Sequence, residues 1–490
     1  MIDPQREWQR VRETFQKIWG YPDFRPPQDE IIRSLLNGFD TLIVMPTGGG
    51  KSICFQLPAL LQNGLTIVIS PLVALMENQV QELKERNLPA ALIHSQLPKY
   101  LRKQTLKAIA AQKLRLLYLS PETLLSVPVW EKISQPNIKI NGLILDEAHC
   151  LVQWGDTFRP AYRRLGAVRS SLLKHKPDAK IAIAAFTATA DPTAQKIITN
   201  TLQLKQPKTF LLSPYRQNLH LKVKTVWTPK GRRQQTLKYI EKRKRQTGLI
   251  YVRSRRESEE LEEWLSSLKY QTAAYHAGLI DTQRRKIEND WLEGKIKFVI
   301  CTSAFGMGIN KPNVRWVVHF HSPLLLSEYL QEIGRGGRDG KIADTLTLIS
   351  EPTGLLNPED KQRNQFFISK LQKQYQKAEA IAKKIPDRGD LNSITEQFKD
   401  GKIALALLHS VGQLEWIDPF NYRRNNNKDS SSFAKLNSIQ QRFIQETTRF
   451  LHTRTCRWQF LLNAFGFTED AKDFQCGHCD NCRSKGRRQK

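Results

Sequence analysis

The sequence lacks any long apolar run and any export signal. No stretch of about 18 apolar residues, the length that a membrane-spanning helix requires, occurs among the 490 residues. The N-terminal segment, residues 1–7, is polar and has no apolar core like that of a signal peptide. These absences predict a cytoplasmic protein without a membrane partner.

Acidic residues are scarce relative to basic ones. The chain has 47 Asp and Glu against 76 Lys and Arg, a net charge of +29. Such an excess favours a polyanionic partner, which can be nucleic acid or an anionic membrane. Because no membrane segment is present, we expect nucleic acid. The alternative is that the charge only keeps the protein soluble.

Cysteine is also scarce, but four of the seven cysteines gather near the C-terminus. Without an export signal, disulfides are not expected. The spacing C-x19-C-x2-C-x2-C suits a closed tetrahedral zinc shell. A redox pair or an unused cluster is the alternative, which four thiols at this spacing argue against. His478 stands among the ligands, and we expect it to point outward. The predicted zinc ligands are Cys456, Cys476, Cys479 and Cys482.

Residues 40–350 alternate short apolar segments with amphipathic helical ones, which predicts βαβ units and an α/β fold with parallel sheets. A polar, basic break over Leu211–Pro229 predicts the junction of two lobes, at residues 1–210 and 211–350. The strand candidates are Thr41–Met45, Thr66–Ser70, Leu114–Leu119, Gly142–Leu145, Ile181–Phe186, Gly248–Tyr251, Phe298–Cys301 and Val314–His319.

The strand rhythm stops after Glu351. A basic helix is predicted over residues 358–385. A helix pair and a hairpin over residues 391–424 predict a winged-helix insertion, within a linker at residues 351–435. A helical zinc module at 436–483 and a basic tail at 484–490 follow. A helical spacer with a disordered loop is the alternative to the winged helix. We expect three basic residues at the hairpin tip to contact duplex phosphates: Arg423, Arg424 and Lys428.

A glycine-rich segment, Met45–Ser52, joins the first strand to a helix. Its backbone N–H groups can close on phosphate oxygens, Lys51 can reach the terminal phosphates, and the Ser52 hydroxyl can bind magnesium. Met45 stands where the general pattern has Gly, and a glycine-rich turn without function is the alternative. The predicted ATP and magnesium contacts of this loop are Thr47, Gly48, Gly49, Gly50, Lys51 and Ser52.

An acidic pair, Asp146 and Glu147, follows the buried strand that ends at Leu145. Downstream of a phosphate loop, Asp146 can hold magnesium and Glu147 can orient the attacking water. Phosphoryl transfer also requires a positively charged group beside the γ-phosphate, to stabilise the negative charge that develops there. Arg335 and Arg338 can supply this group from the second lobe. Taken alone, the acidic pair or the arginines can be ordinary solvated groups.

The ordered set of motifs resembles the RecQ family of superfamily 2 DNA helicases, over roughly residues 10–350 and 436–483. The resemblance rests on segments at residues 15–28, 69–72, 118–122, 149–162, 186–190, 274–279, 301–312 and 329–339. It implies two RecA-like lobes with ATP between them and 3′-to-5′ DNA unwinding in recombination and repair. The family's usual winged-helix and further helical domains do not follow the zinc cysteines here.

The resemblance also implies roles for single residues. Tyr21 would stack on adenine while Arg25 and Gln28 hold the nucleotide, and Arg338 would be the arginine finger. The loop at residues 149–162 offers aromatic faces for base stacking, although these aromatics can also be ordinary core residues. The implied coupling residues are His149, Thr187 and Thr189. The implied DNA contacts are Ser70, Trp154, Phe158, Arg159, His276 and Thr302.

Three residues depart from the family pattern: Pro27 replaces Gly, Asn310 replaces Asp and Gly336 replaces Ala. None removes a predicted catalytic group. We therefore expect a monomeric, nucleoid-associated ATPase that uses ATP, Mg²⁺ and Zn²⁺ and binds single-stranded DNA and single/double-strand junctions. A single-stranded-DNA-binding protein is an expected partner. The alternatives are an RNA helicase, a translocase that does not unwind, and a DNA-binding zinc protein with an inactive motor.

Overall fold

The computed structural model describes residues 4–488 apart from residues 47, 153–158, 306–308, 310 and 426–430. The chain forms two compact units. The first contains residues 1–212 and 371–436, and the second contains residues 213–370 and 437–490. The unit boundaries fall within α14 (Glu359–Ala382) and α17 (Ser431–His452). Among the helices described, none is long and apolar enough to cross a membrane.

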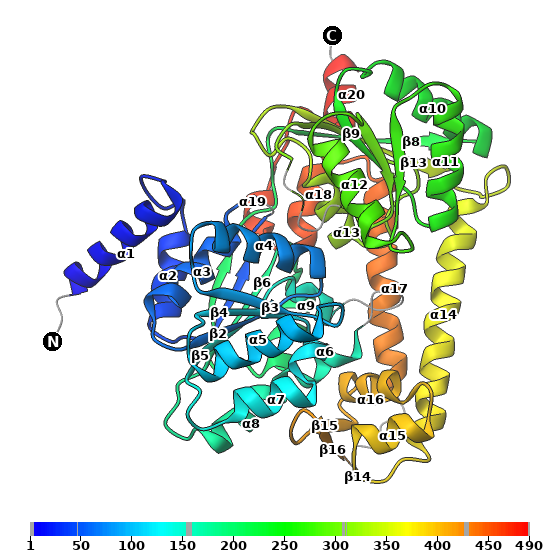
Figure 1. Cartoon of the computed structure of the whole chain (residues 1–490). Coiled ribbons are helices and arrows are strands. Elements are labelled where there is room, and N and C mark those ends of the chain that lie inside the picture. The colour runs from blue at the N-terminus through cyan, green and yellow to red at the C-terminus, as the bar shows by residue number, and fades with distance from the viewer. Residues whose placement is uncertain are drawn as a thin grey trace. The chain divides into compact units, whose positions relative to one another are not determined.

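The first unit contains a seven-stranded parallel sheet in the order β3-β4-β2-β5-β6-β1-β7 (Figure 1). Its strands are β1 Thr41–Val44, β2 Leu65–Ile69, β3 Ala90–Ile93, β4 Leu116–Leu119, β5 Ile140–Leu145, β6 Ala182–Thr187 and β7 Lys208–Leu211. The accompanying helices are α1 Pro4–Trp19, α2 Gln28–Leu36, α3 Lys51–Leu61, α4 Val73–Glu85, α5 Lys99–Ala110, α6 Pro121–Leu124, α7 Val127–Ser134, α8 Gly166–His175 and α9 Pro192–Leu202.

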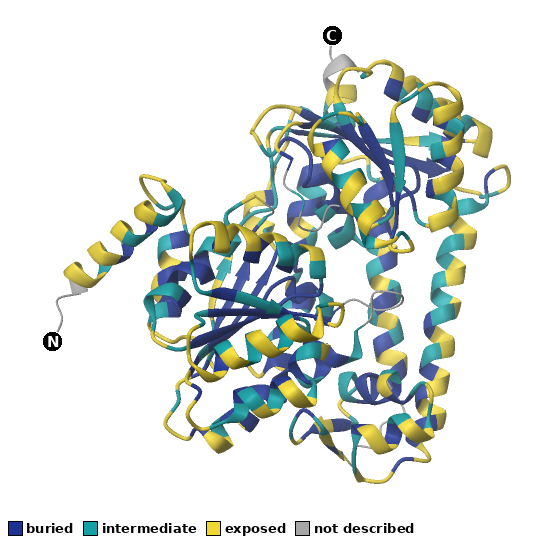
Figure 2. Ribbon diagram, viewed as in Figure 1, coloured by how far each residue is buried: buried dark blue, intermediate teal, exposed yellow. Residues whose placement is uncertain are grey.

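The core of this unit explains why the phosphate loop is held firmly. Apolar side chains of α2, α3 and α4 pack against β1, β2 and β6. The strands appear dark blue in Figure 2 because helices cover the sheet, as expected for a parallel sheet. Strand β1 is paired on both sides, with β6 and with edge strand β7, so the loop that follows it begins at the carboxyl edge of the sheet.

The second unit contains a six-stranded parallel sheet in the order β10-β11-β9-β12-β13-β8. Its strands are β8 Leu219–Val226, β9 Thr247–Tyr251, β10 Thr272–Tyr275, β11 Phe298–Cys301, β12 Val314–His319 and β13 Ala343–Ser350. Its further helices are α10 Pro229–Glu241, α11 Arg255–Ser267, α12 Asp281–Leu292, α13 Leu326–Ile333, α18 Arg457–Ala464, α19 Thr468–Ala471 and α20 Asp480–Arg488.

The predicted junction over Leu211–Pro229 is confirmed, because the boundary between the two units falls between Leu212 and Ser213. The same segment also contains β8, which was not among the predicted strands. Apolar Leu219, Leu221 and Val223 alternate there with polar residues, because β8 is the edge strand and one of its faces reaches solvent. Such an alternating pattern contains no continuous apolar run and therefore did not predict a strand. The same holds for β13, in which Thr345 and Thr347 interrupt the apolar residues.

The insertion forms a small antiparallel sheet in the order β14-β16-β15 with two helices. The elements are β14 Arg388–Asp390, α15 Leu391–Gln397, α16 Gly401–Ser410, β15 Leu414–Trp416 and β16 Asn421–Arg424. This order, preceded by α14, is consistent with the predicted winged-helix insertion. Gly412 has φ +76°, which explains why the second helix stops beside it.

The predicted position of the basic residues in the hairpin is wrong. Leu414 pairs with Arg424 at the open end of the ladder, so the tip is at residues 417–420. Arg423 forms an ion pair with Glu415 of the neighbouring strand, with 2.9 Å between the charged atoms. Lys428 lies outside the described residues. The two arginines were misplaced because a hairpin's register depends on turn length, which composition does not reveal.

The tip of the hairpin packs on the lobe of the same unit. The Phe420 ring lies edge-on to Trp130 of α7, with 5.4 Å between centroids. The Arg164 guanidinium donates a hydrogen bond of 3.1 Å to the Pro419 carbonyl. Arg164 is the last residue of the short 3₁₀ helix η3 (Pro160–Arg164), which also contacts α16. The tip is therefore covered by protein, and the expected contact of its end with duplex phosphates is not supported.

Candidate active site and zinc centre

The phosphate loop leaves β1 and ends where α3 begins at Lys51. Gly48 and Gly50 have φ of +86° and +78°, a region that glycine enters without strain. A side chain on Gly49 would overlap Met45, whose atoms fill the space beside it. The departure at Met45 is thus accommodated by the glycine four residues later. Thr47 lies outside the described residues.

The Lys51 ammonium nitrogen is buried and makes no hydrogen bond to any residue that the structure describes. A buried ammonium without a partner is costly, so such a group indicates a site for an anionic ligand. Ser52 follows it in the first turn of α3. This arrangement fits the terminal phosphates of a nucleotide, with the helix N-terminus adding its dipole.

Gln28 connects the N-terminal segment to the phosphate loop. Its side chain is buried, its Nε2 donates to the Gly49 carbonyl at 3.1 Å, and its Oε1 accepts from the Arg25 N–H at 2.9 Å. Tyr21 is 49% exposed, so one ring face is available for stacking. The structure therefore places Gln28 against the phosphate loop and Arg25 beside Gln28, and the nucleotide-binding roles of these two residues and of Tyr21 stay predictions.

Asp146 and Glu147 stand at the end of β5. The Asp146 N–H donates to the Ile69 carbonyl at 2.9 Å, and Asp146 Oδ1 accepts from the Glu147 N–H at 3.0 Å. Glu147 has φ +53°, a left-handed conformation that costs energy outside glycine and is common at functional sites. Burial, and then the neighbouring charge of Glu147, raise the pKa of Asp146 to about 6. Two carboxyl groups crowded into one buried site repel each other when ionised, and a divalent cation bound there relieves this repulsion.

His149 lies between the acidic pair and β6. Its Nδ1 is 3.2 Å from Glu147 Oε2 and 3.2 Å from Thr187 Oγ1. The Thr187 hydroxyl in turn donates to the Thr189 carbonyl at 3.1 Å. Burial opposes ionisation of His149, but Cys150 and Glu147 raise its pKa to about 10. Hydrogen bonds thus join the three predicted coupling residues, and the charged pair of His149 with Glu147 extends this chain of contacts to the acidic pair.

The structure describes four of the six predicted DNA-contacting residues, in different surroundings. Arg159 lies 3.8 Å from Glu122 in a partly exposed ion pair that little stabilises the fold. Ser70 is buried, and its hydroxyl has no partner among the residues described. His276 is held by Glu259 at 2.9 Å, and Thr302 follows β11. Trp154 and Phe158 lie outside the described residues.

The two predicted arginines follow α13 in the second unit. Arg335 is buried, and the Arg338 guanidinium donates to the Ile309 carbonyl at 3.1 Å. Gly337, between them, has φ +55° and no room for a side chain beside Asn218.

Residues that sequence reasoning missed hold α13 in place. Glu332 receives two hydrogen bonds of 2.8 Å from Arg253 and lies 3.1 Å from His319. Burial opposes ionisation of Glu332, but the charge of Arg253 and the hydrogen bonds from His319 and Arg253 together lower its pKa to about 2. The sequence did offer one indication of this network. Glu332 is a charged residue one helical turn before Arg335, on an otherwise apolar helix face. This buried network orients the helix end from which Arg335 follows.

The four C-terminal cysteines come together. Their sulfur atoms all lie within 4.8 Å of one another, which is the donor set of a tetrahedral zinc site. The Cys476 N–H donates to Cys456 Sγ and the Cys479 N–H to Cys476 Sγ, each at 3.3 Å. Such N–H donors favour thiolates, and the neighbouring thiols with these N–H groups hold the pKa of Cys456 well below its ordinary value. The residues fit a structural zinc ion.

His478 does not join this cluster. Its ring lies 5.0 Å from His220 of β8 and 6.2 Å from Tyr215. The metal-ligating group contains cysteines alone among the residues described.

Two parallel-sheet α/β lobes, a phosphate loop and a following acidic pair define the class of RecA-like nucleoside-triphosphate motors. Residues 25–197 match the DEAD/DEAH box helicase family, residues 231–340 the helicase conserved C-terminal domain and residues 421–483 the RecQ zinc-binding family. The chain is 52% identical over 474 residues to an "ATP-dependent DNA helicase RecQ" of Synechocystis sp., which covers 97% of this chain and 98% of the relative. The chain belongs to the RecQ family, and it is an ATP-hydrolysing DNA helicase.

Other relatives share mainly the motor. A Haemophilus influenzae "ATP-dependent DNA helicase RecQ" is 39% identical over 339 residues, 69% of this chain, and the match spans 53% of that protein. Among solved structures, Saccharomyces cerevisiae Dbp5 bound to RNA and ADP BeF3 matches with a TM-score of 0.58 at 16% identity, over 73% of this chain and 90% of that one. That likeness shows the two-lobed fold alone.

Proposed function

We propose that this helicase translocates 3′ to 5′ on single-stranded DNA and unwinds duplexes during recombination and repair. The observation that carries the motor mechanism is the chain of contacts that runs from Glu147 through the ion pair with His149 and on by hydrogen bonds to Thr187 and Thr189. It joins the residue that would orient the attacking water to two residues at the end of β6. The family supports DNA as the track.

At the nucleotide, Lys51 binds the terminal phosphates, and Ser52 and Asp146 hold Mg²⁺, which neutralises charge on the transferred phosphoryl group. Glu147 orients and polarises the attacking water. The adenine is held by Tyr21, Arg25 and Gln28. Arg335 and Arg338 act on the γ-phosphate from the second lobe, with Arg338 as the arginine finger.

Along the DNA, the segment between His149 and Arg159 offers the link between hydrolysis and the strand. Bases stack on Trp154 and Phe158 while Arg159 contacts phosphate. A change in the bound DNA strand therefore reaches His149 through the polypeptide segment that joins them. Ser70, His276 and Thr302 add contacts to the strand. ATP binding closes the lobes and hydrolysis opens them, which moves the enzyme along one strand.

We also propose that the protein works as a nucleoid-associated monomer and that a single-stranded-DNA-binding protein is a partner. The proposed division of labour assigns ATP binding to residues 1–210, and the second motor lobe to 211–350. The linker with its insertion, at 351–435, connects the motor to the zinc module at 436–483 and the basic tail at 484–490.

Strand displacement with tailed duplexes tests the polarity. We expect the enzyme to unwind 3′-tailed and forked duplexes in the presence of ATP and to leave 5′-tailed duplexes paired. Faster unwinding of the 5′-tailed substrate would reverse the assignment. The same preparation should show greater ATPase stimulation by single-stranded DNA than by RNA of equal length, which separates a DNA motor from an RNA motor.

The apparent Mg²⁺ affinity should depend on pH because the pKa of Asp146 is raised to about 6. Below that pH, Mg²⁺ must displace a proton, so the apparent dissociation constant should rise by up to about tenfold per pH unit. Above pH 7 it should be flat. Mg²⁺ titrations of ATPase activity at pH 5 to 8, with the MgATP concentration held constant, measure this. An affinity that stays constant down to pH 5 contradicts the role of Asp146.

A further inference from the structure

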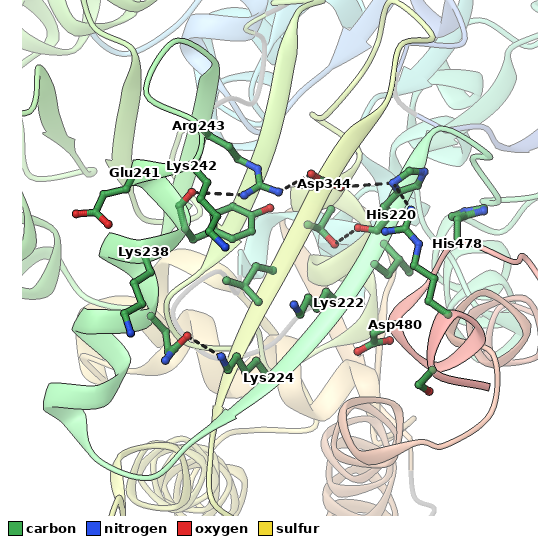
Figure 3. A pocket seen from close by; sticks show the side chains of 17 residues that line it. His220, Lys222, Lys224, Lys238, Glu241, Lys242, Arg243, Asp344, His478 and Asp480 are labelled. Carbon is green, nitrogen blue, oxygen red and sulfur yellow. Dashed lines mark hydrogen bonds and ion pairs between the residues drawn. The ribbon is translucent and has the colours of Figure 1, made fainter. Parts of the chain in front are cut away.

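A basic cavity lies in the second unit, outside the motor motifs described above and beside the zinc module. It has a volume of about 930 Å³ and is lined by β8, α10 and the start of α20 (Figure 3). Six basic side chains line it against three acidic ones. The basic residues are Lys222, Lys224, Lys238, Lys242, Arg243 and Arg483.

Two different periodicities bring four lysines to this cavity. Lys222 and Lys224 are two residues apart on β8 and therefore share one face of the strand. Lys238 lies in α10, and Lys242 follows it by four residues at the helix end, so these two also share a face. α10 packs against β8, which places both lysine rows on one cavity.

Two of the three acidic groups of the cavity are already engaged. Asp344 receives a hydrogen bond of 2.6 Å from Arg243 and lies 3.4 Å from His220. Asp480 accepts from Arg457 at 2.6 Å and from the Val223 N–H at 2.9 Å. Glu241 is exposed. In the part of the chain that the structure describes, no carboxylate forms an ion pair with Lys222, Lys238 or Lys242.

Convergence of like charges is unfavourable for the protein alone. Partial burial, and then the charges of three neighbouring lysines, lower the pKa of the Lys224 ammonium. Lys224 also donates to Gln235 at 2.7 Å. The lysines of an edge strand can serve to prevent strand pairing between molecules. That purpose accounts for Lys222 and Lys224, but not for the second row on α10.

We propose that this cavity binds the phosphate backbone of single-stranded DNA, as a second contact outside the motor's own track. A single strand can bend into a concave site, whereas a duplex presents its phosphates on a convex, stiff surface. The contact is electrostatic and independent of base sequence. It rests on the DNA binding of the family and is independent of the direction of translocation.

Salt-dependent binding of the full chain tests this site. The variant Lys222→Gln/Lys242→Gln removes one charge from each row and spares the hydrogen-bonded Lys224. Fluorescence anisotropy with labelled oligothymidylate at several salt concentrations gives the slope of log K against log salt. We expect its magnitude to fall by about 1.4, since each single-strand phosphate contact contributes about 0.7.

A matched variant, Lys230→Gln/Lys361→Gln, removes two exposed lysines of the same unit outside the cavity and should leave slope and basal ATPase activity unchanged. Zinc content reports that each variant is folded. An unaltered slope in the cavity variant would mean that these lysines serve only to prevent strand pairing at the edge of the sheet, and it would overturn the proposal. Lost duplex binding with intact single-strand binding, or lost tripolyphosphate binding alone, would assign another ligand and also overturn it. Tailed-duplex unwinding at low salt reports polarity separately.

Discussion

Replacing Lys51 with alanine is expected to reduce ATP hydrolysis by about 10³-fold or more, as loss of a charge that stabilises phosphoryl transfer does. The Lys51 ammonium is buried at the start of α3, and no described residue offers it a hydrogen bond. Its hydrogen-bonding capacity is therefore unused until phosphate arrives, although its charge interacts with that of Asp146. Steady-state ATPase assays with saturating single-stranded DNA measure the loss.

Two further measurements separate this effect from misfolding. Lys51→Ala removes a buried ammonium group that donates no hydrogen bond to any described residue, so the thermal unfolding midpoint should not fall, and DNA binding without nucleotide should remain. The companion Glu147→Gln should lose turnover while it still binds ATP, because the proposed role of Glu147 lies in orienting water rather than in holding phosphates. Undiminished turnover in Lys51→Ala would refute the assignment of the phosphate loop.

Much of the motor could be predicted because its functional residues lie in short, contiguous segments of the sequence. The phosphate loop follows a buried strand, and the acidic pair follows another, so both sit at the carboxyl edge of one parallel sheet. The four cysteines could be assigned to zinc from spacing, and their sulfur atoms do converge. Local pattern is sufficient wherever the functional group and its support are neighbours in the chain.

The rest depends on pairing between distant segments. Edge strand β8 alternates polar and apolar residues, and only its partner β13 reveals that it is a strand. The hairpin tip was misplaced because register is decided by Leu414 pairing with Arg424. Arg253 and Glu332, 79 residues apart, form a buried pair that no local pattern announces. The amide of Gln28 could be predicted to hold a nucleotide, but not to bond the loop's own backbone.

The zinc module is attached to the second lobe through β8. The Trp458 indole N–H donates to the Leu219 carbonyl at 3.2 Å, and Asp480 accepts from the Val223 N–H at 2.9 Å. Asp480 directly follows the ligand Cys479 and is paired with Arg457 at 2.6 Å. Metal binding therefore positions the residue that covers part of the edge of β8. The apolar side chains of α18 share a core with β8 and α13.

Loss of zinc should consequently destabilise the lobe as well as the module. We expect the purified chain to contain about one zinc per molecule and Cys479→Ser to lose it. Structural zinc sites contribute about 10–16 kcal/mol of apparent binding free energy in isolated peptides. Even about 3 kcal/mol lost from this unit would lower its unfolding midpoint by about 6–12 °C. Metal analysis and differential scanning calorimetry of the full chain measure both effects.

Cys301→Ala is the matched control, because Cys301 is a fully buried thiol of the same unit that is not a ligand. It should keep its zinc and lose only the packing of one sulfur atom, a smaller fall in the midpoint. Chelation of the native protein should reproduce the calorimetric change of Cys479→Ser, and added zinc should reverse it only where all four thiols remain. A zinc-free chain that unfolds at the native midpoint would contradict the structural role, since the four sulfur atoms would then converge without a stabilising ion.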